Sequence, residues 1–333
     1  MGNAGTFAPS GQLKLHYCLA PATTTQDGGP VDAGPPPDGG AALQRHFVSV
    51  DPATGAVTTI FSLSTNPPTS WIINKTYTRY LVQVQDASMT LWLYTPAGGA
   101  PVKVDSDVAY MMWLPDGESI VYRTMKSELK RADLSGTPVL KTLMTKGVAA
   151  LPAYKTPGSQ GTWTRAGLSP DGKWLHVRAS TGSVAAADLS LASTETPGTP
   201  TQLASEKAAI FGDPFTADSQ TMAYIMNVAS TAGIGTLVVR PVAGGPPMEV
   251  ATGVYWSLFG NGSRLVLMDH YADGDPVGRF DLRWVNLATS GAKPQLLATQ
   301  VDEKIYFDST KDKLIWAAQS ESAQTGIFAA ALP

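Results

Sequence analysis

A run of carboxylates near residue 270 is the part of this sequence whose residue types and spacing point most directly to chemistry. Three aspartates, Asp269, Asp273 and Asp275, fall within the seven residues of the segment 269–275. Calcium prefers oxygen ligands such as these carboxylates, so the three are candidate ligands for calcium, the one cofactor that the sequence indicates. The segment is expected in a loop, and its spacing differs from that of an EF-hand. The alternative is a solvated turn, because Asp and Gly are common turn residues.

A second set of residues, aromatic and polar, recurs on those segments that are expected to form the innermost strands of repeated sheets around a central channel. Aromatic and polar groups that converge in a concavity are typical of ligand sites. The alternative is that these side chains pack between neighbouring sheets. The candidates are Trp71, Tyr110, Trp163, Arg165, Asp213, Tyr255 and Tyr306.

Several other kinds of chemistry lack their motifs in this chain. The sequence contains no Gly-x-Ser-x-Gly elbow, no phosphate loop and no dinucleotide fingerprint, so a serine hydrolase and dependence on ATP or NAD are not expected. Cys18 is the only cysteine, which leaves no intrachain disulfide and no cysteine-rich zinc site. Affinity for nucleic acid depends on basic residues that neutralise phosphates. The formal charge of −3 gives no sign of such a basic patch, so nucleic acid is not expected as a partner.

The elements that must position these residues follow from a repeated interval. An apolar residue ends one strand, a turn follows, and an apolar residue begins the next strand seven positions later, with repeats 40 to 55 residues apart. Such a period is typical of propeller blades, so we predict an all-β chain folded as a β-propeller of four-stranded antiparallel blades. The intervals run from Ile73 to Tyr80, Trp113 to Ile120, Leu168 to Leu175, Phe215 to Met222, Leu258 to Leu265 and Phe307 to Leu314.

Each repeat is predicted to form four short strands, because apolar residues alternate with period two between turn signals. In one repeat the predicted strands are 108–114, 119–124, 128–134 and 139–143. The first turn there is Pro115-Asp116-Gly117. Proline presets φ, Asp binds local backbone groups, and Gly accepts a positive φ.

The two ends of the chain leave the number of blades open. Strands are predicted around Leu13–Tyr17, His46–Val50 and Val57–Phe61, with residues 21–40 as a disordered Gly/Pro/Asp-rich insertion that cannot bury a core. A single domain of seven blades over residues 1–333 is favoured, and six blades are the alternative. The last repeat lacks a fourth strand, so residues near the N-terminus close the ring, the fold has six blades, or a segment upstream is missing.

The strings Trp113-Leu114-Pro115-Asp116-Gly117 and Leu168-Ser169-Pro170-Asp171-Gly172 resemble the PD40 repeat of TolB-type, or WD40-like, β-propellers. The resemblance covers roughly residues 70–320 at the level of the repeat, and two repeats carry Pro-Asp-Gly intact. It implies a binding module of the bacterial cell envelope, periplasmic or extracellular. TolB also has an N-terminal α/β domain, and nothing before residue 70 here is expected to form one.

These observations lead to one favoured function and two alternatives. We expect a non-enzymatic propeller, monomeric and without a transmembrane segment, that recognises a protein or peptide. Residues 1–5 lack the basic and apolar regions of a signal segment, so none is expected within this chain. One alternative is a propeller hydrolase or lyase that acts on a sugar or lactone with a channel-bound metal. The other is a structural fragment of a longer envelope protein.

Overall fold

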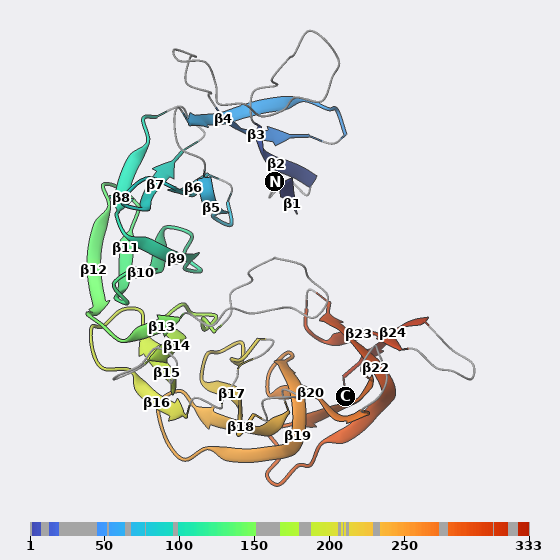
Figure 1. Ribbon diagram of the computed structural model, residues 1–333. Helices are drawn as coiled ribbons and strands as arrows, with labels where there is room; N and C mark the ends of the chain where they lie inside the picture. The colour runs from blue at the N-terminus through green and yellow to red at the C-terminus, as the bar shows by residue number, and fades with distance from the viewer. Residues whose placement is uncertain are drawn as a thin grey trace, which may run out of the picture. The chain divides into compact units, whose positions relative to one another are not determined.

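The structure is a computed structural model in which the described part of the chain is built from β-strands (Figure 1). No helix occurs in this part, and hence none that is long and apolar enough to span a membrane. The described residues are 2–7, 13–19, 45–51, 53–63, 68–76, 78–95, 99–150, 167–179, 188–205, 208, 210, 213–228, 234–272, 279–308, 310–318 and 326–332.

Four of the sheets have four antiparallel strands each, arranged in the order of the sequence. The first has β1 (Gly2–Phe7), β2 (Leu13–Leu19), β3 (Arg45–Val50) and β4 (Val57–Leu63); the second has β5 (Pro68–Ile73), β6 (Tyr80–Val84), β7 (Thr90–Tyr94) and β8 (Val102–Asp105); the third has β9 (Val108–Trp113), β10 (Ser119–Thr124), β11 (Leu129–Asp133) and β12 (Val139–Met144); the fourth has β13 (Val148–Ala150), β14 (Trp174–Ala179), β15 (Asp188–Ser193) and β16 (Thr201–Ala204).

The fifth sheet has eight strands, because two of its strands are long enough to serve two successive repeats. The first part of β19 pairs with β18 and the second part with β20, and β22 divides in the same way between β21 and β23. Its strands are β17 (Thr221–Met226), β18 (Gly235–Pro241), β19 (Met248–Phe259), β20 (Arg264–Ala272), β21 (Arg279–Asn286), β22 (Gln295–Phe307), β23 (Lys313–Ala318) and β24 (Gly326–Ala331).

The seven-residue interval is confirmed at five of its six places, where the two predicted residues are cross-strand partners. The sixth prediction is wrong by one residue, because Leu265 pairs with Phe259 and not with Leu258. There the amide of Gly260 donates to the carbonyl of Arg264, and Gly262 has φ +63°. A tighter glycine turn therefore replaces the longer Pro-Asp-Gly turn.

The predicted Pro-Asp-Gly turn forms between β9 and β10. Gly117 has φ +72°, and the Asp116 carboxylate accepts hydrogen bonds from the amides of Glu118 and Ser119, both at 2.9 Å. Burial raises the pKa of Asp116, but these hydrogen bonds outweigh it, so the pKa lies below its ordinary value. The four predicted strands of this repeat are confirmed to within one residue at each end.

Apolar cores lie between the first and second, the second and third, and the fourth and fifth sheets. Leu91 and Val104 of the second sheet share one core with Ile120 and Tyr122 of the third. In the same way, one face of each repeat in the eight-stranded sheet packs against the next repeat. The core residues are therefore those that alternate along each strand, as expected for sheets that stack face to face.

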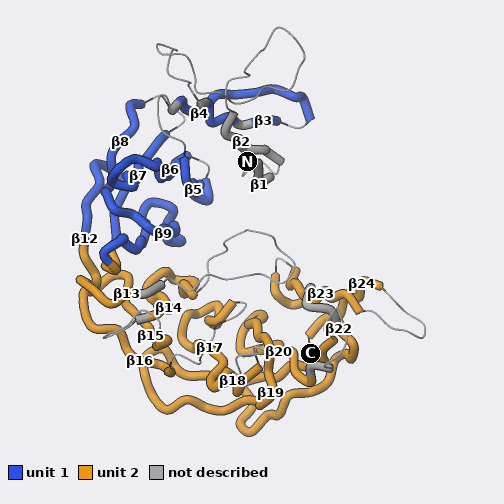
Figure 2. The backbone as a smooth tube through the Cα atoms, in the orientation of Figure 1, with its two compact units in different colours: residues 1–126, 131–141 blue, residues 127–130, 142–333 orange. Residues whose placement is uncertain are grey.

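The chain divides into two compact units (Figure 2), residues 1–126 with 131–141 and residues 127–130 with 142–333. The single domain and the number of blades stay predictions, and the insertion 21–40 lies outside the described residues. The three strands predicted near the N-terminus are confirmed as β2, β3 and β4, with β1 added at the edge.

Candidate functional site

Trp71, one of the residues expected to line a channel, packs between two sheets. Its ring lies edge-on to that of Phe47 on β3, with centroids 4.7 Å apart and an interplanar angle of 74°. Both rings belong to the core that the first sheet shares with the second. The structure therefore assigns Trp71 to a contact that stabilises the stacking of the sheets.

The other predicted ligand residues differ in their surroundings. Tyr255 on β19 stacks on Phe280 at 4.6 Å, whereas Tyr306 on β22 is 51% exposed. Asp213 is exposed and pairs with Lys311. Tyr110 on β9 is half-buried, and burial raises the pKa of its hydroxyl. Trp163 and Arg165 lie outside the described residues.

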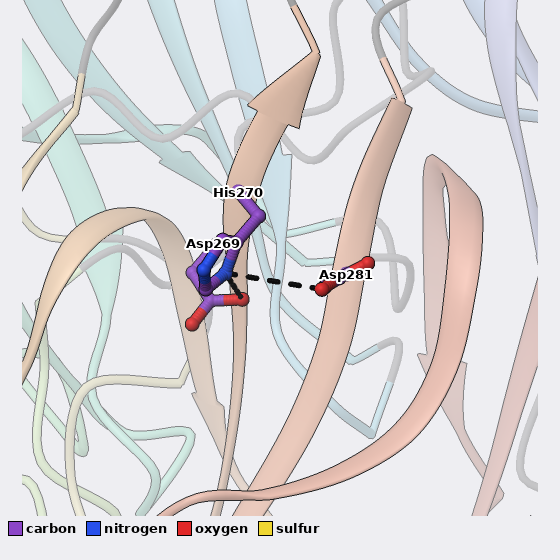
Figure 3. A group of neighbouring side chains, drawn as sticks. All are labelled: Asp269, His270 and Asp281. Atoms are coloured by element: carbon purple, nitrogen blue, oxygen red, sulfur yellow. Dashed lines mark ion pairs between the residues drawn. The ribbon is translucent and has the colours of Figure 1, made fainter.

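The acidic segment has a different structure from the expected loop, because its first residue lies within a strand. Asp269 is on β20, is 4% exposed and is the cross-strand partner of Asp281 on β21. The register shifts after this pair, and His270 adopts φ +52°. A β-bulge re-aims the side chain of the bulged residue, and the imidazole of His270 is directed at the two carboxylates (Figure 3).

These side chains form an ion-pair network with Arg283, which also lies on β21. Nδ1 of His270 is 2.8 Å from Oδ1 of Asp269 and 3.8 Å from Oδ2 of Asp281. Nε of Arg283 donates to the same Asp269 oxygen at 2.9 Å, and Nη2 donates to Asp281 Oδ2 at 3.1 Å. Burial lowers the pKa of Arg283, but the two carboxylates outweigh it and raise the pKa above its ordinary value. The guanidinium therefore neutralises two like charges that face each other across the strands.

The network is a poor match for the calcium site that the sequence indicated. The ligand atoms of Asp269, His270 and Asp281 lie within 4.8 Å of one another, a spacing that could hold a metal. However, the oxygens that would bind the ion already accept hydrogen bonds from Arg283, whose positive charge would repel a cation. Asp273 and Asp275 lie outside the described residues, so their part in a calcium site stays a prediction.

Asp281 and Arg283, the two members of the network on β21, were not predicted from the sequence. The residues alternate along their strand, as residues on one face of a sheet do. Their proximity to Asp269 could have been expected only from the register of β20 against β21. That register also shifts between Asp269 and Ala272, which the residue types do not reveal.

A second candidate site is the edge of the eight-stranded sheet that β24 forms. Among the described residues β24 pairs with β23 alone, over all six of its residues and without a register shift. Its sequence has no charged residue and no proline, and Ile327 is 82% exposed. An edge of this kind is a template for pairing with another chain.

The outer strands of the other repeats differ from β24, because they carry the devices that protect a sheet edge. In five of them the cross-strand pairing with the neighbouring strand passes over one residue, as in a β-bulge. These residues are Ile60, Val104, Leu203, Val250 and Leu297. Each skipped residue is aliphatic and lies in or against a core shared with the next repeat. Bulges and edge charges discourage foreign strands, and Lys103, Lys141 and Glu249 supply such charges.

Comparisons with known proteins identify the fold. No family model matches the chain, and no curated protein matches it in sequence. Among solved structures, a eukaryotic initiation factor has a TM-score of 0.56 at 12% identity, covering 99% of this chain and 75% of that chain. Dipeptidyl peptidase 4 of Porphyromonas gingivalis has a TM-score of 0.55 at 12% identity, covering 99% of this chain and 50% of that chain. The stacked antiparallel sheets and these likenesses define the class: the chain is a β-propeller protein.

TolB of Acinetobacter baumannii, a protein of the type that the repeats resemble, is also among the matches. Its identity is 15% and its TM-score 0.38, covering 85% of this chain and 72% of that chain. A likeness of this size carries no argument about function. The other two likenesses show the fold alone, and the chain spans half the length of the dipeptidyl peptidase.

Proposed function

We propose that this protein is a non-enzymatic β-propeller module that binds a protein or peptide by adding an extended strand of the partner to β24. The observation that carries the proposal is the unprotected edge of β24, six residues long, uncharged and paired on one side among the described residues. Strand addition provides affinity through main-chain hydrogen bonds and specificity through alternate side chains.

An enzymatic role has less support from the described residues. A propeller hydrolase or lyase with a bound metal needs several free acidic or histidine ligands. In the described part of the chain the structure brings together Asp269, His270 and Asp281. Both carboxylates accept hydrogen bonds from Arg283, and the imidazole pairs with the carboxylates.

We also propose a place in the bacterial cell envelope, periplasmic or extracellular. The likeness of two repeats to PD40 sequences supports it. So does the content of charged residues, 15% against about 25% in typical soluble proteins.

A library of random heptapeptides displayed on phage tests the binding function directly. We expect the purified full chain to select peptides whose addition slows amide hydrogen exchange at Gly326–Ala331. Ile327→Lys places a charge on the edge and should abolish this binding without altering the melting temperature, because the side chain is exposed. The matched control is Val139→Lys, at an exposed position on β12. Selected peptides that bind the Ile327→Lys protein as well as the wild type would refute strand addition at β24.

A further inference from the structure

The turn between β19 and β20 contains Asn261-Gly262, the one Asn-Gly pair of the sequence. In peptides an asparagine is most prone to deamidation when glycine follows it. The backbone nitrogen of the following residue attacks the side-chain amide carbon, and glycine has no Cβ to hinder that approach. The sequence therefore supplies the reacting atoms, and the fold decides whether they are accessible.

Both residues of the pair are exposed, and the attacking amide is available. The N–H of Gly262 donates to no other residue among those that the structure describes. Gly262 adopts φ +63°, and no atom lies within 4 Å of the position that a Cβ would take. A pocket of about 300 Å³ opens beside the turn, lined by Asn261, Gly262, Ser263, Arg264, Asn286 and Ala288. Water therefore has access to the turn, and the glycine has the conformational freedom that ring closure requires.

Three other asparagines each lack one of these conditions. Asn74 is 3% exposed, and its side-chain oxygen accepts hydrogen bonds from two backbone amides. Asn286 is followed by Leu287, whose amide donates to a backbone carbonyl at 3.0 Å. Asn227 is exposed, but Val228 follows it, and a β-branched side chain crowds the backbone nitrogen. Asn261 is therefore the one of the four at which sequence and fold both permit the reaction.

Asn261 also joins two turns, so a change in its side chain alters a contact. Its Nδ2 donates to Asp312 Oδ1 at 3.1 Å, and its backbone amide donates to the Lys311 carbonyl at 3.0 Å. Lys311 and Asp312 lie in the turn between β22 and β23. Nη1 of Arg264 donates to the same oxygen of Asp312, also at 3.1 Å. One carboxylate of the neighbouring turn thus binds both the side-chain amide and the guanidinium.

We infer that Asn261 is a site of spontaneous deamidation and that its conversion loosens the contact between these two turns. The backbone nitrogen of Gly262 loses its proton and forms a bond to Cγ of Asn261. The bond from Cγ to the side-chain nitrogen breaks, and ammonia leaves with a proton from the solvent. Water then opens the resulting succinimide ring. Attack at Cγ gives aspartate, and attack at the backbone carbonyl carbon gives isoaspartate, without oxidation or reduction.

Either product replaces the amide donor by a carboxylate close to Asp312. Two like charges then share the guanidinium of Arg264, and the hydrogen bond from Nδ2 is lost. Isoaspartate also lengthens the main chain of the turn by one carbon atom, because the chain then passes through the side-chain carbons. The turns should therefore separate more readily after conversion.

Incubation of the purified full chain at pH 8, followed by fragment mass spectrometry, tests the site. We expect the mass change from amide to acid to accumulate at Asn261 before it is detectable at Asn227, the exposed asparagine of the same chain. The product should contain isoaspartate as well as aspartate, because direct hydrolysis of the amide yields aspartate alone. The reaction should be slower at pH 6, since the attacking nitrogen must lose its proton.

A matched variant and two contrary outcomes make this test decisive. Asn261→Gln keeps an amide but cannot close the same five-membered ring, so the reaction should be lost. Equal rates at Asn261 and Asn227, or aspartate without isoaspartate, would overturn the assignment of the site.

Hydrogen exchange at the amide of Asp312 tests the loosened contact. This amide lies in the neighbouring turn and donates to Asp308 Oδ1 at 3.1 Å. We expect faster exchange there in Asn261→Asp, which reproduces one product, than in the wild type at pH 7, because local opening sets the exchange rate. The difference should shrink in high salt, since exposed charges are screened. Equal exchange in the two proteins at low salt would overturn the inferred loosening.

Discussion

Acidification from pH 7 to pH 5 should destabilise this protein through one buried histidine. His176 on β14 is fully buried and stacks on Phe215 at 4.7 Å, and neither ring nitrogen has a hydrogen-bond partner among the described residues. Burial lowers the pKa of the imidazole from its ordinary 6.5 to about 3. The folded protein therefore keeps His176 neutral over a pH range in which the unfolded chain binds a proton.

The sign and the size of the effect follow from proton linkage. Because the unfolded state binds more protons, the free energy of unfolding falls as pH drops below 6.5 and continues to fall until about pH 3. At pH 5 the unfolded histidine is protonated and the folded one is not. The loss is then about 1.5 pH units, which corresponds to about 2 kcal/mol. Six aspartates have pKa values below their ordinary 3.8, so they change the free energy of unfolding mainly below pH 5. They are Asp86, Asp116, Asp133, Asp171, Asp218 and Asp308.

Urea denaturation at pH 7 and pH 5 measures this difference in the wild type and in His176→Phe. Phenylalanine keeps the ring on Phe215 and removes the titratable group, so the pH-dependent loss should shrink by about 2 kcal/mol. Gly167 is close to His176, and His176→Leu serves as a second variant if the larger ring does not fit. A pH dependence that is the same in the wild type and in the variants would refute the reasoning, because another group would then be responsible.

Three further predictions concern stability and are measured by urea denaturation at pH 7. Gly235→Ala should destabilise the fold by about 2 kcal/mol or more, because the added Cβ would lie 2.3 Å from a backbone carbonyl oxygen. The control is Gly136→Ala, which has open space around it and should change stability by less than about 0.5 kcal/mol. Equal effects of the two substitutions would contradict the prediction. Arg283→Met should cost about 3 kcal/mol, because it removes the guanidinium that neutralises the buried Asp269 carboxylate beside Asp281. Adding Asp269→Asn should recover part of the loss, and no recovery would argue against the ion pair. Asn74→Ala should cost about 2 kcal/mol, because this buried amide accepts from two backbone N–H groups and donates to a carbonyl of the next turn; a neutral result would show that those groups find other partners.

Local information in the chain was enough to predict the repeated hairpins. A strand pair joined by a short turn depends on neighbours in sequence, so the Pro115-Asp116-Gly117 turn and the partners Trp113 and Ile120 could be predicted from residue types alone. Strands β2, β3 and β4 of the first sheet were also predicted, because apolar residues alternate along each of them.

Contacts between strands that depend on register were decided by the tertiary structure. The register of β20 against β21 sets which of their side chains face each other, and thereby brings Asp269 to Arg283. The bulges of the outer strands were also invisible in the sequence, because an aliphatic residue such as Val104 has the same appearance in a regular strand. A one-residue shift moves every later side chain to the other face of a sheet. The sequence therefore determined the repeats and their turns, whereas the structure decided which residues meet across strands.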